Sequence, residues 1–447
     1  MTSFLADALL TDLYELTMAA SYHAQGMNGP ATFDLFVRDL PRERNFLVAA
    51  GLEQALEFLE GLRFDAEAVS YLRSLGLFSE SFLACLAELR FTGELWAFPE
   101  GEVVFPGEPL LRVTAPRIEA QLVETYLLTT TNFQTMVASK AARVALACGD
   151  HAFVDFSARR DHGPEAALGA ARAAYIGGAA GTSNVLAGMR FGIPVAGTMA
   201  HSYVMAFESE EAAFRAFARD FPQRSTLLID TFDTERGARR AARVARELGA
   251  EGISVSGVRI DSGDLASLCR SVRAILDAAG LQGMRIFLSG DLDEHRIAAL
   301  LEQGVPADSF GVGTQLGTSA DAPYLGGVYK LVEDERGPTM KTSTGKPMLP
   351  GRKQVHRVEV NGRDDHDVIA LEGEPVTGGR PLLERVMASG RRVGPRAGLD
   401  AARDRARGAI AKLPDRLRGL DRAAAPYVVL ASPALRDLEA RLRAQLG

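Results

Sequence analysis

The chain has 447 residues, of which 47% are hydrophobic and 24% are charged, so it can bury large cores and is long enough for two or three domains. Its formal net charge of −7 argues against nucleic acid or an anionic membrane as the main partner. Local clusters of arginine can still bind a small anion.

Cysteine usage and the N-terminal residues indicate the compartment. The three cysteines are too widely spaced for a CxxC metal site or a disulfide framework, which favours a reducing cytoplasm. The N-terminal segment has no basic region before its apolar residues, which argues against a secretory signal. The glycine-rich stretch 176–200 contains polar residues and does not resemble a membrane span. We expect a cytoplasmic protein that does not enter the membrane.

The first zone, residues 1–148, is expected to form an α/β domain. Residues 7–22 and 46–62 have apolar positions at helical spacing. Residues 89–113 interrupt apolar and aromatic residues with glycine and proline, which predicts short strands joined by turns. Residues 118–147 are expected to form a long helical stretch.

The second zone, residues 149–332, alternates short apolar segments with helical patterns. From residue 193 onward the predicted strands begin roughly 20–35 residues apart, the size of a βα unit. This spacing favours a (β/α) barrel over an open sheet. The predicted strands are 152–156, 193–196, 226–230, 258–261, 285–289, 309–312 and 327–332, and the predicted helices among them are 235–248, 265–279 and 293–303.

The third zone, residues 333–447, differs in composition from the second. Residues 340–357 are rich in Lys, Thr, Gly and Pro, and a short strand is predicted at 355–360. Helices rich in Arg and Ala are predicted at 399–412 and 434–445, with their charges facing solvent.

Polar residues follow six of the predicted strands. Because the carboxyl ends of parallel barrel strands meet at one face, these residues are expected to share a cavity. In chain order the polar segments are Asp155–Arg160, Thr198 with His201, Asp230–Asp233, Arg259–Asp264, Ser289–Asp291 and Gly311–Thr314.

The residue types favour a phosphorylated ligand. Gly311–Thr314 can wrap backbone N–H groups around a phosphate, although a tight turn would have the same sequence. Asp230 and Asp261 suit ribose hydroxyls or a Mg²⁺ ion shared with a pyrophosphate. Helix N-capping is the alternative role for both, and it is the role expected of Asp264 and Asp293.

Three arginines and one histidine complete the candidate set. Arg159, Arg160 and Arg259 suit a phosphate or carboxylate, or else surface ion pairs. His201 lies in the small-residue segment 197–202, which fits an active-site edge as well as a hydrogen-bonded structural histidine. The sequence contains no HExxH, GxSxG or Walker A motif, so hydrolase and P-loop readings lack support.

Seven motifs, in order, resemble those of the nicotinate phosphoribosyltransferase family, and the likeness runs from about residue 9 to 357. The motifs are DLYELTMAASY (12–22), FSARRDHGPEAALGAARAAYIGGAAGTSNVLAG (156–188), GTMAHS (197–202), LLIDTFDT (227–234), GVRIDSGDL (257–265), FGVGT (310–314) and KxSxGKxMxPGRKQVxR (341–357). The resemblance implies a type II phosphoribosyltransferase: an irregular α/β barrel beside an α/β domain built from N- and C-terminal segments. Such proteins usually form head-to-tail homodimers with shared active sites.

The resemblance also assigns roles. His201 matches the histidine that ATP phosphorylates, and Asp230 and Asp261 match positions near the ribose and the Mg²⁺–pyrophosphate. Arg259 matches a catalytic position that contacts nicotinate. Tyr14 matches a tyrosine that reaches the pyridine ring from the partner subunit. The other substrate-binding positions implied are Phe156, which stacks on the ring, Arg159, Ser183, Thr198, Gly290, Gly311, and the 5-phosphate ligands Gly313 and Thr314.

The implied reaction forms nicotinate mononucleotide and pyrophosphate from nicotinate and phosphoribosyl pyrophosphate, in the Preiss–Handler salvage route to NAD. It uses Mg²⁺ and is coupled to ATP hydrolysis through a phosphohistidine. The pyridine nitrogen is already a nucleophile at pH 7, so catalysis needs positioning and fixed charges rather than a general base.

Three alternatives remain. In nicotinamide phosphoribosyltransferase an acidic residue occupies the position of Ser183, so the serine favours the acid as substrate. Quinolinate phosphoribosyltransferase has the same fold but is shorter and lacks the ATP-linked histidine. A non-catalytic phosphate-binding barrel would leave His201 and Tyr14 unexplained.

Overall fold

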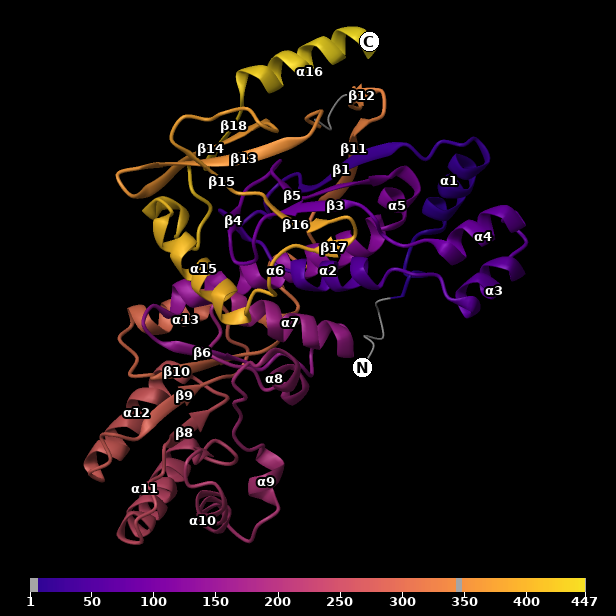
Figure 1. The fold of residues 1–447 in the computed structure, drawn as a ribbon. Coiled ribbons are helices and arrows are strands. Elements are labelled where there is room, and N and C mark those ends of the chain that lie inside the picture. The colour runs from indigo at the N-terminus through magenta and orange to yellow at the C-terminus, as the bar shows by residue number, and fades with distance from the viewer. Residues whose placement is uncertain (1–6, 343–347, 447) are drawn as a thin grey trace. The chain divides into compact units, whose positions relative to one another are not determined.

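The computed structural model describes residues 7–342 and 348–446 (Figure 1). The chain divides into two compact units: unit 1 comprises Met1–Ser139 and Tyr324–Gly447, and unit 2 comprises Lys140–Pro323. The N- and C-terminal segments therefore fold together in one unit. Residues 343–347 of the last motif lie outside the described part of the chain.

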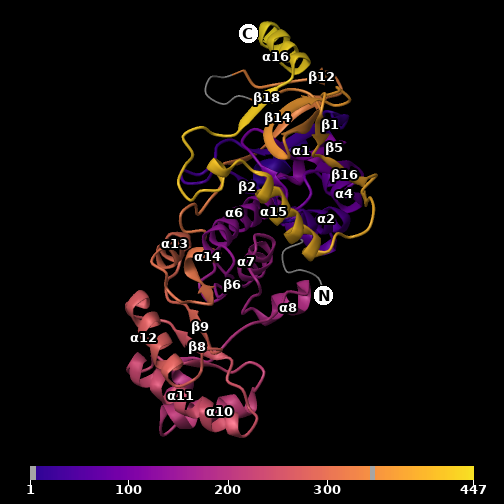
Figure 2. The same ribbon diagram turned by 90° about the vertical axis from the view of Figure 1, so that its left-hand side faces the viewer.

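Unit 1 is built on a seven-stranded antiparallel sheet to which both terminal segments contribute. Its strand order is β12 (Gly337–Pro338), β11 (Gly327–Asp334), β1 (Pro30–Val37), β5 (Pro109–Pro116), β3 (Glu94–Ala97), β16 (Glu384–Ala388) and β17 (Arg391–Arg392). Figure 2 shows the C-terminal strands of unit 1, in orange and yellow, beside its indigo and magenta N-terminal strands.

The strand predicted at 327–332 in the barrel zone is therefore wrongly placed. It forms part of β11 and pairs antiparallel with β1 in unit 1. Five of the eight residues of β11 are only partly buried, which suits an antiparallel strand with one partly solvated face.

The remaining elements of unit 1 surround this sheet. A four-stranded sheet has the order β15 (Gly379–Pro381), β13 (Lys353–Val360), β14 (Arg363–Leu371) and β18 (Val428–Ala431), and β2 (Leu47–Val48) pairs with β4 (Val103–Val104). The helices are α1 (Leu13–Ala24), α2 (Leu52–Gly61), α3 (Ala66–Ser74), α4 (Glu80–Glu88), α5 (Arg117–Leu122), α15 (Leu399–Lys412), the 3₁₀ helix η1 (Asp415–Leu417) and α16 (Pro433–Leu446). Helix α6 (Glu124–Cys148) runs across the boundary between the units.

Two predicted helices of the first zone begin later than expected. The first begins at Leu13, because Asp12 has the extended backbone of an N-cap residue. The second begins at Leu52, because Gly51 has a φ of +96° and a Cβ there would lie 2.8 Å from the carbonyl oxygen of Thr130. The residues before Gly51 form β2 instead.

Unit 2 contains a parallel sheet with the order β6 (Ala152–Asp155), β10 (Ser309–Val312), β9 (Arg285–Leu288), β8 (Gly257–Ile260) and β7 (Thr226–Leu228). Single parallel bridges from Asp155 to Thr182 and from Thr182 to Val195 extend it by two segments. The strand predicted at 193–196 is reduced to one bridge, because Pro194 has no N–H to donate to a ladder. The α/β fold class predicted from the sequence is confirmed.

Helices cover this sheet, and the polar loops follow the carboxyl ends of its strands. They are α7 (Pro164–Ile176), α8 (Val185–Phe191), α9 (His201–Met205), α10 (Glu210–Asp220), α11 (Thr234–Ala250), α12 (Leu265–Ala278), α13 (Glu294–Glu302) and α14 (Thr314–Gly317). In Figure 1, α11 and α12 lie beside β8 and β9. The core beneath them includes Leu227, Val258 and Ile286, each fully buried and contributing about 1.5–3 kcal/mol. In the described part of the chain, no helix is long and apolar enough to cross a membrane.

Candidate active site

The side chain of Arg259 is the centre of a polar cluster at the carboxyl ends of β8 and β9. Its Nε donates to the hydroxyl of Ser289 at 2.8 Å, and its Nη2 donates to Oδ1 of Asp261 at 2.7 Å. Its Nη1 donates to the hydroxyl of Thr198 at 3.0 Å. These three bonds hold the guanidinium plane in one orientation, a property that a lysine would not provide.

Asp261 remains a carboxylate at neutral pH. Burial raises its pKa, but hydrogen bonds from Ser289 and Arg259 lower it by more, so the net shift of the pKa is downward. The same Oδ1 atom accepts from both donors. A fixed negative charge therefore lies at the end of β8 beside the fixed positive charge of Arg259.

Asp230 is a second carboxylate at the neighbouring strand end and is 9% exposed. Its Oδ2 accepts from the N–H of Asp261 at 2.9 Å and from the hydroxyl of Ser262 at 2.7 Å. Its Oδ1 is buried and has no hydrogen-bond partner among the described residues. An orphaned carboxylate oxygen of this kind is suited to a ligand or a cation.

Helix capping, the alternative role for Asp230 and Asp261, belongs to other residues. Asp233 caps α11 and Asp264 caps α12, each through a carboxylate that accepts a backbone N–H. Asp293 caps α13 in the same way. The predicted capping by Asp264 and Asp293 is therefore confirmed, and the two strand-end carboxylates are left for another role.

His201 is the first residue of α9 and lies at the edge of this cluster. Its Nδ1 is 3.2 Å from the hydroxyl oxygen of Thr231, and its Nε2 is 3.9 Å from Oδ2 of Asp261. The side chain is 40% exposed. The imidazole is thus oriented by one neighbour and accessible to a ligand.

Phe156 follows β6 and forms an aromatic surface beside the cluster. The guanidinium carbon of Arg259 lies 5.3 Å from the centre of its ring, and the ring of Phe287 lies 5.5 Å from it, centre to centre. A Cβ on Gly311 would lie 2.8 Å from Phe156 and 2.9 Å from Phe287. Gly311 therefore serves, in this structure, to make room for the two rings.

Replacing Gly311 with alanine is expected to displace the Phe156 ring, because neither ring can keep its place next to a methyl group. If this ring stacks on a pyridine, as the family resemblance implies, the KM for the pyridine substrate should rise by roughly tenfold, while the KM for a phosphorylated substrate changes little. Steady-state kinetics with each substrate varied would measure this. Gly249→Ala is the matched control, because a Cβ there meets nothing within 4 Å. Equal changes in both KM values would contradict the expectation.

Two further glycine positions differ in their surroundings. Gly290 has a φ of +99°, and a Cβ there would lie 1.9 Å from the carbonyl oxygen of Asp261, so this loop approaches the end of β8 closely. Gly313 precedes α14, whose first residue, Thr314, is exposed. The turn that was expected to bind phosphate therefore follows β10 directly.

The other predicted residues are more dispersed. The N–H of Ser183 donates to the carbonyl of Asp155 at 2.9 Å, which places Ser183 next to the end of β6. Arg159 is exposed in the loop that follows β6. Tyr14 belongs to α1 in unit 1, where it is 46% exposed, and partial burial followed by the charge of Glu124 raises the pKa of its hydroxyl.

Sequence reasoning missed Phe287, and it assigned no individual role to Ser289 or Thr231, although both lie in polar segments that were expected to share the cavity. The side chains of a strand alternate between its faces, so Phe287 and Ser289 share a face of β9, as Arg259 and Asp261 share one of β8. This alternation was a usable signal for the first two. Thr231 had no comparable signal, because its contact with His201 depends on how two loops fold.

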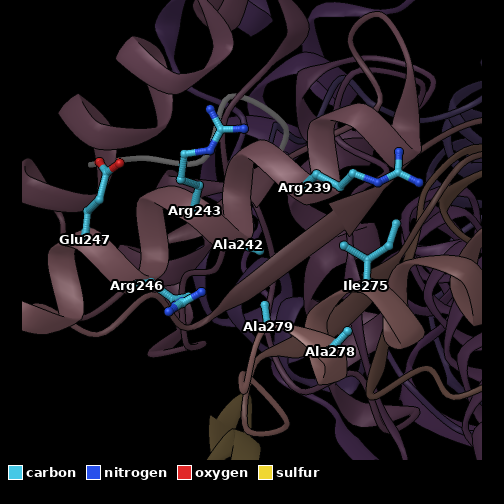
Figure 3. Close-up of a pocket in the computed structure, with 8 residues that line it drawn as sticks. All are labelled: Arg239, Ala242, Arg243, Arg246, Glu247, Ile275, Ala278 and Ala279. Carbon is cyan, nitrogen blue, oxygen red and sulfur yellow. The ribbon is translucent and has the colours of Figure 1, made fainter.

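A groove of about 690 Å³ lies elsewhere in unit 2, between α11 and α12 (Figure 3). Each of these helices starts near the carboxyl ends of the strands and runs antiparallel to them. The C-terminal residues of both helices therefore lie near the amino ends of the strands, away from the polar cluster. Arg239 and Arg243, which line it, pair with Glu235 and Glu211. The groove is best explained as a solvated, ion-paired helix surface.

Comparison with known proteins identifies the family. Residues 9–132 match the model of the nicotinate phosphoribosyltransferase (NAPRTase) N-terminal domain, and residues 151–348 match that of the NAPRTase family. The chain belongs to the nicotinate phosphoribosyltransferase family. The resemblance read from the seven motifs is thereby confirmed.

Individual members of the nicotinate phosphoribosyltransferase family are similar over most of their length. The nicotinate phosphoribosyltransferase pncB2 of Mycobacterium tuberculosis is 51% identical over 437 residues, covering 98% of this chain and 94% of the relative. That of Bacillus subtilis is 45% identical and covers 83% and 77%, respectively. The crystal structure of human nicotinic acid phosphoribosyltransferase has a TM-score of 0.88 at 30% identity and covers 97% of this chain and 99% of the human one.

Proposed function

We propose that this chain forms nicotinate mononucleotide and pyrophosphate from nicotinate and phosphoribosyl pyrophosphate. The observation that carries the proposal is the Arg259-centred cluster at the strand ends of a chain that matches a member of this family over 98% of its length. A cation fixed above an aromatic ring suits a flat aromatic carboxylate, and the neighbouring carboxylates suit a polyhydroxylated, cationic sugar.

The residues then divide the work of the reaction. Arg259 and Thr198 bind the carboxylate of nicotinate, and Phe156 supports its ring. The lone pair of the pyridine nitrogen attacks C1 of the ribose, and the bond to pyrophosphate breaks with its electron pair on the leaving oxygen. Asp230 and Asp261 stabilise the positive charge that develops on the sugar, while Gly313 and Thr314 hold the 5-phosphate.

The strand-end carboxylates also fit a Mg²⁺ ion shared with the pyrophosphate. Asp230 offers the unpartnered Oδ1 atom, and Asp261 offers Oδ2, both of them hard oxygen ligands. Within the described residues no group of three or more acidic, histidine or cysteine side chains could hold a metal ion unaided, so substrate oxygens would have to complete its ligands. The ion, when bound, neutralises charge on the leaving pyrophosphate.

His201 is proposed to couple the reaction to ATP. A tautomer with the proton on Nδ1, donated to Thr231, leaves the lone pair of Nε2 free to accept the γ-phosphoryl group, with ADP as the leaving group. The phosphohistidine adds negative charge beside the pyrophosphate site, and water later releases inorganic phosphate from it. Hydrolysis of the phosphohistidine would drive the transfer forward.

One assay separates the candidate functions. Mononucleotide formation is measured with nicotinate and with nicotinamide, each with and without ATP, in the presence of Mg²⁺. The proposal expects product from nicotinate, more of it with ATP, and much less from nicotinamide, because Ser183 leaves no acidic group for an amide. Product from nicotinamide at an equal rate would favour the amide-specific enzyme. No product from either base would favour a binding protein.

The second substrate-binding aromatic, Tyr14, leads us to propose a homodimer with shared sites. Tyr14 and its neighbour Leu13 are exposed on α1, and Val185 and Met189 are each 70% exposed on α8, close in sequence to Ser183. Large apolar side chains exposed in adjacent helical turns are typical of an interface. A head-to-tail dimer would bring the α1 surface of one subunit to the α8 surface of the other.

Mixed dimers test this arrangement. Tyr14→Ala and Arg259→Gln should each inactivate the enzyme as homodimers, because the first removes one face of the pyridine site and the second removes its cation. When the two variants are mixed and allowed to exchange subunits, half of the dimers are hybrids and each has one intact site. About a quarter of the wild-type activity should then return. Absence of recovery, with subunit exchange verified, would contradict the shared site.

A further inference from the structure

A network of buried hydrogen bonds lies next to the end of β6, beside the proposed substrate site. Asp155, the last residue of β6, is 1% exposed and accepts from the N–H of Ser157 at 2.9 Å and from the hydroxyl of Thr182 at 2.7 Å. Ser157 is fully buried, and its hydroxyl donates to Oδ2 of Asp161 at 3.0 Å. This hydrogen-bond network therefore connects the segment before Ser183 with the loop that follows β6.

Asp161 is the last member of this hydrogen-bond network, and its carboxyl group packs directly against α14. A Cβ on Gly317 would lie 1.9 Å from Oδ1 of Asp161 and 2.5 Å from the hydroxyl oxygen of Ser157, so glycine lets the helix pack onto the carboxyl group. That Oδ1 atom is buried and has no hydrogen-bond partner among the described residues. The N–H of Gly317 donates to the carbonyl of Gly313 at 3.2 Å, so the carboxyl group lies one helical turn from the Gly313–Thr314 turn proposed to bind the 5-phosphate.

We propose that Asp161 is a positioning residue that sets the affinity of the Gly313–Thr314 turn for the 5-phosphate according to the charge of its own carboxyl group. This inference rests on the proposed function. In its neutral form the carboxyl group packs against α14 and does not repel the 5-phosphate of the substrate. In its ionised form the unpartnered oxygen places a negative charge behind a site that must accept another negative charge.

The surroundings of Asp161 place this change of charge near neutral pH. Burial, followed by the like charge of Asp155, raises the pKa of Asp161 to about 6, whereas the Ser157 hydroxyl and the charge of His162 lower it. Helix α14 (TQLG) contributes no titratable side chain. The remaining charged side chains on the loop and in the first turn of α7 are those of Arg159, Arg160 and Glu165. A bound phosphate should raise the pKa of Asp161 further, so substrate binding should take up protons.

Proton uptake on binding tests the proposal without turnover. Phosphoribosyl pyrophosphate with Mg²⁺ is titrated calorimetrically into the full-length protein at pH 6.5, without nicotinate, in two buffers of different ionisation enthalpy. The wild type should take up roughly half a proton more per site than Asp161→Asn. Glu165→Gln is the matched control, because it likewise removes one carboxylate, from the first turn of α7, and it should match the wild type.

Kinetics provide a second readout. At pH 8, Asp161→Asn should lower the KM for phosphoribosyl pyrophosphate by roughly three- to tenfold, with kcat and the KM for nicotinate unchanged. Ser157→Ala removes the hydrogen bond that favours the carboxylate, so the midpoint of the KM–pH profile should move to higher pH.

Either of two results would overturn the proposal: equal proton uptake by wild type and Asp161→Asn, or a loss of kcat and thermal stability in Asp161→Asn with no change in this KM. Failure of the wild type to bind phosphoribosyl pyrophosphate would instead overturn the proposed function.

Discussion

Replacing His201 with alanine is expected to abolish ATP hydrolysis while leaving a weak, ATP-independent formation of nicotinate mononucleotide. The imidazole is the proposed phosphoryl acceptor. Its Nδ1 lies within hydrogen-bond distance of Thr231 and its Nε2 lies 3.9 Å from Asp261, so its loss leaves the three hydrogen bonds of Arg259 in place. The rate in the presence of ATP should fall by roughly two orders of magnitude, to the rate without ATP. Parallel assays of ADP and mononucleotide formation would measure both effects.

Two variants sharpen this experiment. His366→Ala removes a histidine of β14 in unit 1, and it should keep full ATP coupling. Thr231→Val removes the hydrogen-bond partner of Nδ1 without removing the nucleophile, so the yield of phosphoenzyme should fall by less than in His201→Ala. A His201→Ala enzyme that still forms one ADP per mononucleotide would show that the assigned role is wrong.

The position of His201 illustrates what the sequence can and cannot predict. Its place after an apolar strand, in a segment of small residues, was visible in the sequence, as were the polar residues that follow β6, β8 and β9. The rule that parallel strands end at one face then predicted that Arg259 and Asp261 share a site with Asp230, and the hydrogen bond between the two aspartates bears this out. Local sequence predicted helix capping by Asp264 and Asp293, but it left two roles open for Asp230 and Asp261.

The parts that the sequence did not predict depend on contacts between distant segments. A strand pattern at 327–332 shows that the segment is extended, but it does not show which sheet accepts it. The fold assigns it to unit 1 because the chain leaves unit 2 at Pro323. Gly311 was expected to contact phosphate because glycine often does so. Its necessity for two aromatic rings appears only when Phe156 and Phe287 are brought together.

Replacing Arg259 with glutamine is expected to have the largest effect on glycosyl transfer itself. The guanidinium group makes three hydrogen bonds with three partners, and it is the cation proposed to bind the carboxylate of nicotinate. Its loss also leaves the charge of Asp261 without its partner and raises the pKa of that carboxyl group. The value of kcat/KM for nicotinate should fall by roughly 10³-fold, or about 4 kcal/mol.

The comparison of two substrates separates recognition from structural damage. Nicotinamide has no carboxylate, so its already low kcat/KM should fall by much less in Arg259→Gln than that of nicotinate, and the preference for the acid should shrink. Arg259→Lys keeps the charge but cannot reach Thr198, Asp261 and Ser289 together, so it should recover only part of the activity. An equal loss for both bases, together with a lower melting temperature, would mean that Arg259 supports the strand ends and does not select the substrate.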